Sequence, residues 1–293
     1  MNLKNKNLLE IIDFFENLDK DSNNNLSIYV TPLDIDKIGY KSWIDISALY
    51  YFKFLTPFIK DNNTIILNFQ KLNQTNSFHI DKKNTTEKYG VNSEFFNVDK
   101  SSQTSFLYYY IKTLEFINIK DKKQILNIGV NKGDEFQIIK DILENEEFKN
   151  KLLMGIDYSK TAINYAKDLL PYENVSFLCE DINNIDNLNL PKSDLIISIG
   201  TLQSVNIDFK KTFMKLYQNY LTKDGAIILG FPNCRWIDKE MIYGAKVPHY
   251  NFSEMSTVIK DIYFCKKYLQ QKNFRVAITG KDYIFLTARK IVR

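Results

Sequence analysis

From about Asp121 to the C-terminus, short apolar runs alternate with amphipathic segments, and this alternation constrains the fold more than any other feature. The apolar runs lack the strict polar–apolar alternation of a sheet with one face in water. They therefore predict parallel strands covered by helices on both faces, which is an α/β architecture. The expected strands are Gln124–Ile128, Leu153–Asp157, Val175–Cys179, Leu195–Ile199, Ala226–Gly230, Phe274–Thr279 and Tyr283–Ala288. The expected helical segments between the first five are Glu135–Asn145, Lys160–Leu170, a short turn near Ile185, and Phe209–Leu221.

The last two expected strands are separated only by Gly280, Lys281 and Asp282. A connection this short joins antiparallel strands, so one of the two must run against its neighbours. A helix is expected just before them, at about Ser253–Gln271. The sequence thus predicts seven strands that end in a C-terminal antiparallel hairpin.

The first part of the chain has a different texture and predicts a smaller α+β domain. We place this domain at residues 1–118 and the α/β domain at residues 119–293. The aromatic-rich segment Trp43–Phe58 has helical spacing, which is more typical of a core face than of a base-stacking surface. The other elements expected here are helices at Leu8–Leu18 and from Ser101 or Ser102 to about Ile117, and strands at Leu26–Thr31 and Thr64–Phe69.

Composition and charge exclude several classes of protein. Hydrophobic residues make up 44% of the 293 residues and charged residues 25%, so the chain is neither disordered nor collagen-like. A net charge of +4 is too small to indicate a nucleic-acid-binding protein by itself. The most apolar long window, Ile44–Ile59, contains Asp45, Lys53 and Pro57, so no membrane span is expected.

The cysteines and the first residues indicate the compartment. Cys179, Cys234 and Cys265 are odd in number and widely spaced, so they predict neither a disulfide framework nor a metal site. The beginning of the chain is polar and does not look like a secretory signal. We therefore expect a cytoplasmic protein.

The loop after the first strand of the α/β part has the chemistry of a nucleotide-binding turn. Gly129 lets the backbone turn tightly, and Gly133 permits close approach of a ligand and of the next helix. Asn131 stands where a positive φ is needed. The G-x-G-x-x-G pattern of nicotinamide enzymes fails, and Asp134 at the helix start would repel a pyrophosphate. The expected ligand is an adenosine compound without phosphates, although a plain βα turn is an alternative.

Polar residues also follow the other strands. Asp157, followed by Tyr158, ends the second strand, where its carboxylate can accept hydrogen bonds from two ribose hydroxyls. After the third strand, Asp181 can accept from an adenine amino group, and the Ile182 backbone can donate to the ring. Gly200 closes the fourth strand and opens onto the crevice where open α/β sheets bind ligands.

Taken in order, these segments resemble the class I S-adenosylmethionine-dependent methyltransferases, from Gln124 to about Lys290. The resemblance implies a Rossmann-like seven-stranded methyltransferase sheet, S-adenosylmethionine as cofactor, no metal, and in-line transfer of a methyl group. The segments that carry it are Ile125–Gly133, Asp157, Asp181, Asp194–Gly200 and Leu221–Gly230. The cofactor-binding residues it implies are Asn127, Gly129, Asn131, Gly133, Asp157, Tyr158, Asp181, Ile182 and Gly200.

Two positions depart from the pattern of the family. Asn127 stands where the family usually has an acid that helps to hold the cationic amino group of the cofactor. Losing that charge is worth about 1 kcal/mol for a solvated pair. Asn131 replaces the middle glycine of the loop. The resemblance also makes Tyr89 a candidate to close over the cofactor, since residues before the core often do so in this family.

The acceptor is expected near the loop after Gly200 and in the long insertion after Gly230. His249 is the candidate general base because its ordinary pKa lies near neutrality, and a surface histidine without a role is the alternative. Arg235 can grip an acidic group of the acceptor or pair with a surface acid. The full set of predicted acceptor-binding residues is Gln203, Arg235, Trp236, Tyr243 and Tyr250.

Three functions are consistent with these residues. The first is methyl transfer to an oxygen or nitrogen atom of a small-molecule acceptor, with residues 1–118 forming a lid or acceptor pocket. The second is an RNA methyltransferase, which makes nucleic acid the less favoured partner. The third is a catalytically inactive scaffold that binds S-adenosylmethionine, for which Asn127 is the only sequence support. No membrane partner is expected, and the oligomeric state is not predicted.

Overall fold

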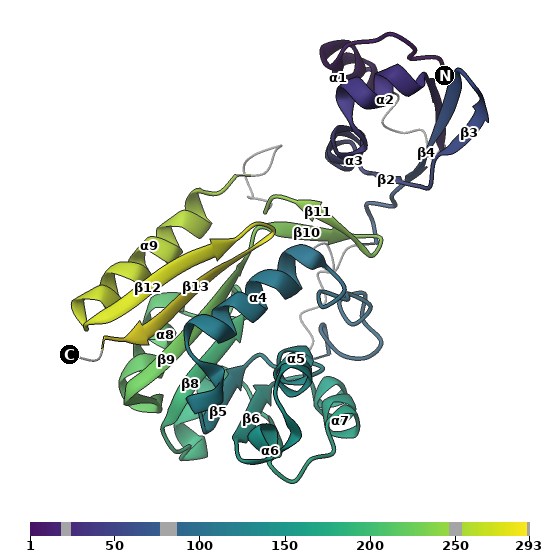
Figure 1. Ribbon diagram of the computed structural model, residues 1–293. Helices are drawn as coiled ribbons and strands as arrows, with labels where there is room; N and C mark the ends of the chain where they lie inside the picture. The colour runs from purple at the N-terminus through teal and green to yellow at the C-terminus, as the bar shows by residue number, and fades with distance from the viewer. Residues whose placement is uncertain (19–24, 77–86, 246–253, 292–293) are drawn as a thin grey trace. The chain divides into compact units, whose positions relative to one another are not determined.

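The computed structural model describes residues 1–18, 25–76, 87–245 and 254–291 (Figure 1). The chain divides into two compact units. The smaller unit is Met1–Ile80 with Arg235–Tyr243, and the larger unit is Asp81–Cys234 with Gly244–Arg293. This division falls earlier than the predicted boundary at residue 118, so the residues just before the α/β sheet belong to its unit. The role of a lid or acceptor domain for residues 1–118 stays a prediction.

The larger unit is built on a seven-stranded sheet in the order β12-β13-β9-β8-β5-β6-β7. β5, β6, β7, β8 and β9 pair in parallel, and β13 runs antiparallel to both β9 and β12. This confirms the predicted α/β sheet with its C-terminal antiparallel hairpin. The strands are β5 (Gln124–Ile128), β6 (Leu152–Asp157), β7 (Val175–Cys179), β8 (Ser193–Ile199), β9 (Leu221–Pro232), β12 (Phe274–Gly280) and β13 (Tyr283–Lys290).

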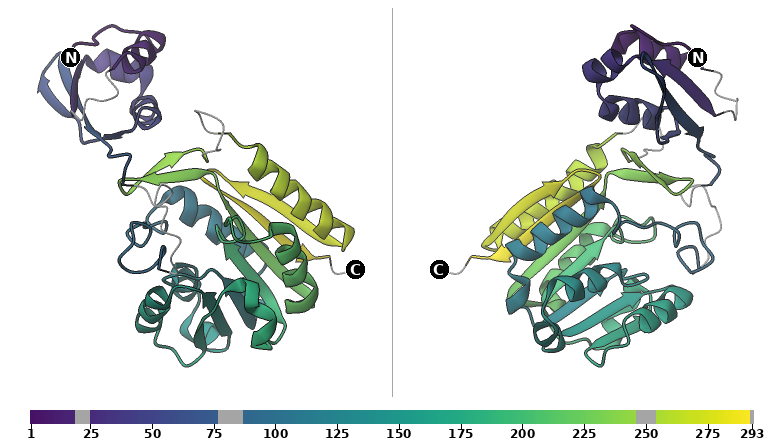
Figure 2. Two further views of the ribbon diagram at one scale, coloured as in Figure 1. Left: turned by 180° about the vertical axis from the view of Figure 1, so that it is seen from behind. Right: turned by 45° about the vertical axis from the view of Figure 1, so that its right-hand side comes forward.

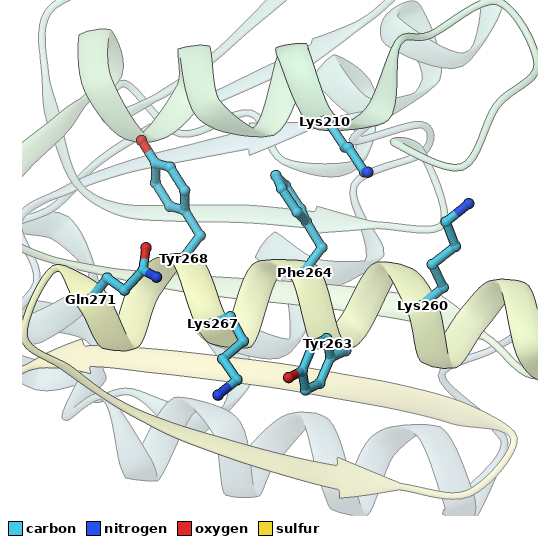
Figure 3. Close-up of a pocket in the computed structure, with 7 residues that line it drawn as sticks. All are labelled: Lys210, Lys260, Tyr263, Phe264, Lys267, Tyr268 and Gln271. Carbon is cyan, nitrogen blue, oxygen red and sulfur yellow. The ribbon is translucent and has the colours of Figure 1, made fainter.

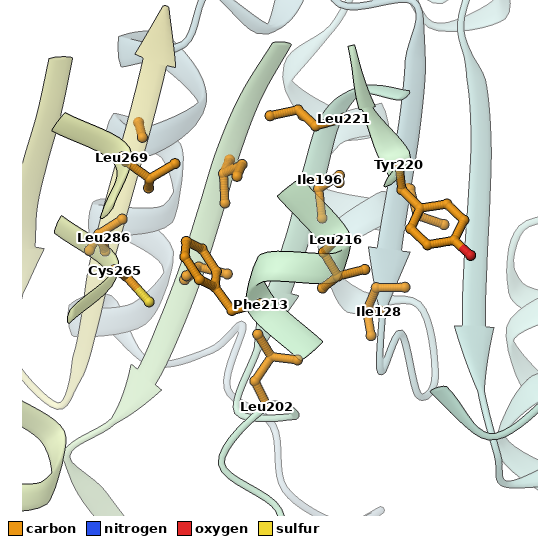
Figure 4. Close-up of a cluster of buried hydrophobic side chains, with 14 of the residues drawn as sticks. Ile128, Ile196, Leu202, Phe213, Leu216, Tyr220, Leu221, Cys265, Leu269 and Leu286 are labelled. Carbon is orange, nitrogen blue, oxygen red and sulfur yellow. The ribbon is translucent and has the colours of Figure 1, made fainter. Parts of the chain in front are cut away.

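Helices cover both faces of this sheet (Figure 2). On one face, Phe213 of α8 and Cys265 of α9 pack in a cluster with Leu286 of β13 (Figure 4). On the other face, the ring of Phe106 in α4 lies 5.7 Å from that of Phe285, as expected because neighbouring strand residues point to opposite faces. The helical elements are α4 (Thr104–Phe116), η1 (Ile119–Asp121), α5 (Asp134–Ile142), α6 (Asn145–Lys149), α7 (Lys160–Leu169), η2 (Ile182–Leu188), α8 (Phe209–Lys215), the π-helical turn η3 (Leu216–Tyr220) and α9 (Ser256–Gln271). Within the described ranges, no helix is long and apolar enough to cross a membrane.

The smaller unit contains a four-stranded antiparallel sheet in which β4 pairs with β1, β2 and β3. Trp43 of α3 is completely buried in its core, as is Phe69 of β4, so Trp43 is a core residue and is not available for base stacking. The elements are α1 (Leu8–Glu16), β1 (Leu26–Val30), α2 (Pro32–Ile38), α3 (Tyr40–Leu49), β2 (Phe52–Phe54), β3 (Phe58–Asp61) and β4 (Thr64–Lys71).

Two local predictions are wrong. The helix expected over Trp43–Phe58 ends at Leu49, because Tyr51 takes a left-handed φ of 63° and the chain continues as strands. The helix expected from Ser101 or Ser102 begins later, after Gln103, and has no side-chain cap. The hydroxyls of Ser101 and Ser102 donate instead to the carboxylate of Asp99, and such local turns compete with helix capping.

The insertion after β9 forms a hairpin of β10 (Cys234–Ile237) and β11 (Glu240–Tyr243). Its two-residue turn has positive φ at both Asp238 and Lys239, which matches the twist of a tight antiparallel hairpin. Ile237 and Ile242 of the hairpin pack with Leu72 of the N-terminal segment. The hairpin therefore belongs to the smaller unit although it is an insertion in the sequence of the larger one.

Removing the Phe213 ring should destabilise the larger unit. Phe213 is 1% exposed and packs in the α8–α9 face of the core, so Phe213→Ala should lower the free energy of unfolding by about 3–5 kcal/mol. Urea denaturation followed by circular dichroism measures this. Ile259→Ala on α9 is the control, since Ile259 is 56% exposed and should change stability little. Equal losses in the two variants would contradict the assignment of this core.

Candidate active site

The candidate site lies where the strand order of the larger sheet reverses. β5 has β6 on one side and β8 on the other, and ligands bind at such switch points, beyond the carboxyl ends of the strands. The loops after β5 and β8 meet there. Gly129 and Thr201 lie so close together that a Cβ at Gly129 would overlap the side chain of Thr201. Gly129 also has a φ of 75°, so both its backbone and its surroundings require glycine.

Asn131 has the predicted positive φ, of 45°. Its backbone N–H donates to Asp157 Oδ2 at 2.9 Å, and its side-chain Nδ2 donates to the carbonyl of Tyr89 at 2.8 Å. Gly133 begins α5 with a φ of 92°. A Cβ there would lie 3.1 Å from Leu170 Cδ1, so the close approach that Gly133 allows is to the residue that follows α7.

Asp157 is buried beside this loop, with 7% of its surface exposed. Its two carboxylate oxygens accept backbone N–H groups from Asn131 and Ser159, each at 2.9 Å. Each oxygen keeps a second acceptor position. Burial raises the pKa of Asp157 and outweighs the effect of these hydrogen bonds. The adjacent Tyr158 ring makes an edge contact with the ring of Tyr89 at 6.0 Å, and burial also raises the pKa of Tyr158.

The remaining cofactor candidates follow β7 and β8. The N–H of Glu180 donates to the carbonyl of Asp157 at 3.0 Å, which holds the two strand ends together. Asp181 Oδ1 caps η2 by accepting from the N–H of Asn183 at 2.8 Å, so its second carboxylate oxygen can still serve a ligand. The side chain of Ile182 packs in the core. Gly200 has a φ of 75° at the end of β8, and Gln203 in the next loop is exposed.

A segment before the core, Glu87–Lys100, lies against these loops, and we refer to it as the strap. Glu87 accepts from the Ser159 hydroxyl at 3.1 Å and from the Lys160 N–H at 3.0 Å. Lys132 Nζ of the glycine loop donates to the carbonyl of Val98 at 2.9 Å. The sequence reasoning proposed only Tyr89 from this segment, since no motif marks the others.

The strap ends in a buried ion pair between Lys100 Nζ and Glu135 Oε1, with 12% and 1% of the two side chains exposed. Asn127 Nδ2 donates to Glu135 Oε2 at 3.3 Å. Burial alone would lower the pKa of Lys100, but the charges of Glu135, Asp134 and Asp157 outweigh it and raise that pKa. Sequence reasoning missed Lys100 and Glu135, because neither stands at a motif position.

The predicted acceptor residues of the insertion lie in the smaller unit. Arg235 Nη1 is 3.4 Å from the hydroxyl of Tyr51, and its guanidinium carbon lies 5.7 Å from the centre of that ring. Trp236 is buried and Tyr243 is 48% exposed. Their role in acceptor binding stays a prediction. The candidate base His249 and its neighbour Tyr250 lie outside the described residues.

Comparison with known families agrees with this geometry. The profile of a family described as "Methyltransferase domain" matches residues 119–277, which is more than half of the chain. No curated protein matches the chain in sequence. The chain therefore belongs to this methyltransferase family.

Several solved structures are similar to the chain. A SAM-dependent methyltransferase from Aquifex aeolicus is 18% identical, with a TM-score of 0.48 over 72% of this chain and 100% of that one. The plantazolicin methyltransferase BpumL in complex with SAH is 13% identical, with a TM-score of 0.48 over 71% and 94%. A precorrin-6y C5,15-methyltransferase from Geobacter metallireducens GS-15 is 14% identical, with a TM-score of 0.44 over 66% and 94%.

The chain is an enzyme that uses S-adenosylmethionine, and the chemistry of the site fits this cofactor. Asp157 offers a strand-end carboxylate with acceptor capacity for hydroxyl groups. The turn at Gly129 admits no side chain. Lys100 and Glu135 place one cation and one anion beside the loop.

The clash at Gly129 predicts an asymmetry between the two loop glycines. Gly129→Ala adds a clash with Thr201 to the strain of a positive φ, so it should lower the free energy of unfolding by about 2 kcal/mol or more. Gly133→Ala is the matched control, because the atom nearest to the added Cβ is a flexible methyl group of Leu170. This variant should lower the free energy of unfolding by about 1 kcal/mol. Urea denaturation measures both, and a greater loss for Gly133→Ala would contradict the described contact between the loops.

Proposed function

We propose that this enzyme transfers a methyl group from S-adenosylmethionine to an oxygen or nitrogen atom of a small-molecule acceptor. The observation that carries the proposal is the strap. Four sets of contacts tie it to the elements around the cofactor loops, through Glu87, the Tyr89 carbonyl, the Val98 carbonyl and Lys100. A segment held against the cofactor loops in this way favours an acceptor that is small, because small-molecule sites are concave and bury most of the ligand.

The cofactor supplies an electrophilic methyl group on a sulfonium sulfur. In the proposed site, Asp157 and Asp181 bind the adenosine part, and Gly129 and Gly200 keep the adjoining loops clear of side chains. The proposed role of the strap is to help exclude water and orient the reactants, since alignment of the reactants provides much of the rate enhancement in a displacement of this type. Gln203 and His249 are the proposed acceptor-side residues, with His249 as general base for an oxygen acceptor.

Replacing the carboxylate of Asp157 tests the cofactor site. Asp157→Asn keeps the size of the side chain, removes the charge that strengthens hydrogen bonds from ribose hydroxyls and replaces one acceptor oxygen by a donor. Thermal melting of the variant checks that the fold survives the lost backbone hydrogen bond. Calorimetric titration with S-adenosylhomocysteine should show roughly ten- to a hundred-fold weaker binding. Glu173→Gln, a change at an exposed acid, is the control and should bind as the native protein does. Native-like affinity of Asp157→Asn would rule out this residue as the ribose-binding acid.

The acceptor can be found by comparing metabolites and RNA nucleosides from cells with and without the gene. Under the proposal, one methylated small molecule is missing from cells that lack the gene, and its unmethylated form accumulates. The purified enzyme should methylate that form with labelled S-adenosylmethionine. A change confined to RNA nucleosides would overturn the small-molecule assignment.

A second candidate function is methyl transfer to RNA, and one surface groove favours it. The groove lies between α8 and α9, has a volume of about 350 Å³ and combines lysines with aromatic rings (Figure 3). Lys210 Nζ lies 5.0 Å from the centre of the Phe264 ring, and Lys267 Nζ lies 5.6 Å from that of Tyr263. Tyr263 is exposed, whereas Phe264 is half-buried. Basic side chains beside aromatic rings are one means by which proteins hold single-stranded nucleic acid.

Charge reversal in this groove separates the two candidates. If RNA is the acceptor, Lys260→Glu with Lys267→Glu should weaken binding of a single-stranded oligonucleotide by roughly ten-fold or more and reduce its salt dependence. Lys223→Glu with Lys266→Glu changes the charge equally, and neither residue lines the groove. Equal effects of the two pairs, or no binding by the native protein, would leave the small-molecule function as the better one. Fluorescence anisotropy at two salt concentrations provides the measurement.

A further inference from the structure

The ion pair between Lys100 and Glu135 has no role in the adenosine site proposed above. Both side chains are largely buried, with 12% and 1% of their surfaces exposed. The desolvation of a buried pair offsets most of its attraction, so such a pair is a weak source of stability. Its position beside a ligand-binding loop makes it a candidate for recognising a charged part of the ligand.

Asn127 orients this pair. Its Nδ2 donates to Glu135 Oε2 at 3.3 Å, and the Asn127 side chain is buried at the end of β5. The donation leaves its Oδ1 as an acceptor. An aspartate in this place would set a second carboxylate against Glu135, and repulsion would drive one of the two to bind a proton. Asparagine at 127 and glutamate at 135 are therefore a matched combination.

The cofactor ends in an α-amino acid, which carries an ammonium and a carboxylate group at neutral pH. Binding such a zwitterion away from water requires an anion for the first group and a cation for the second. The described residues beside the glycine loop offer both charges in one place, from two different elements: Glu135 in the first turn of α5 and Lys100 at the end of the strap.

We propose that Glu135, oriented by Asn127, binds the ammonium group of the cofactor's methionine part and that Lys100 binds its carboxylate. In this chain, the negative charge that the family resemblance would place at residue 127 is supplied from the first turn of α5. The inference rests on the proposed cofactor site, and it makes Asn127 a positioning residue and not a sign of lost activity.

A double-mutant cycle at residues 127 and 135 tests the role of Glu135. Titration calorimetry compares S-adenosylhomocysteine with 5′-methylthioadenosine, which lacks the amino-acid end. Glu135→Gln should weaken S-adenosylhomocysteine binding by roughly ten-fold or more and 5′-methylthioadenosine binding by less than about two-fold. Adding Asn127→Asp should restore at least about three-fold of the lost affinity, since it returns the charge to the strand end.

The outcomes that overturn the inference are distinct from those that overturn the proposed function. Equal weakening of both ligands by Glu135→Gln, or a double variant no better than Glu135→Gln, would show that Glu135 acts only on the structure of the loop. Thermal melting of each variant separates loss of folding from loss of binding, and 5′-methylthioadenosine reports whether the adenosine site is intact. A native protein that binds neither ligand would overturn the proposed function itself.

A second arm of the experiment tests Lys100. Decarboxylated S-adenosylmethionine keeps the ammonium group and lacks the carboxylate. Lys100→Met should therefore reduce the affinity for S-adenosylmethionine by roughly ten-fold relative to that for the decarboxylated compound. An unchanged ratio of the two affinities would overturn the role of Lys100 in binding the carboxylate.

Discussion

The hydrogen bond from the Asn131 backbone to the Asp157 carboxylate is the interaction on which the arrangement of the candidate site depends. It joins the loop after β5 to the end of β6, the neighbouring parallel strand. A buried carboxylate must have hydrogen-bond donors, and Asp157 takes one from each side of its strand end, from Asn131 and from Ser159. The same loop reaches the strap through the Asn131 side chain. One buried acid thus sets the shape of the glycine loop and the place where the strap is attached.

The charged side chains around Asp157 also influence one another. Asp134, Glu135 and Asp157 lie close enough to Lys100 to raise its pKa against the effect of burial. A site with this excess of negative charge is suited to a cofactor that carries positive charge on its sulfur and amino groups. Because Lys100 lies at the end of the strap, the electrostatic balance of the site depends on a segment outside the strand motifs.

The sheet could be predicted well because its signals are local. Apolar runs of strand length, glycines at strand ends and a three-residue connection before Tyr283 each report on their own neighbourhood. The same locality explains the failures. The helical spacing of aromatics after Trp43 did not reveal that the helix ends before Tyr51, which has a positive φ. The hydroxyls of Ser101 and Ser102 donate to the nearby carboxylate of Asp99 and do not cap the helix. The positive φ at Asn131 and the contact of the loop after β5 with Asp157 at the end of β6 were predictable, since strand ends in a parallel sheet share one edge.

The sequence by itself determined the succession of strands and helices of an α/β sheet, the loop that turns at Gly129 and the carboxylate that ends the second strand, because each depends on residue types at short spacing. Only the tertiary structure decided that the strap lies on those loops, that Lys100 pairs with Glu135, and that the hairpin Cys234–Tyr243 packs with the N-terminal segment. These contacts join residues far apart in the chain. Which of many lysines meets which acid is fixed by burial and chain path, and no local pattern carries that information.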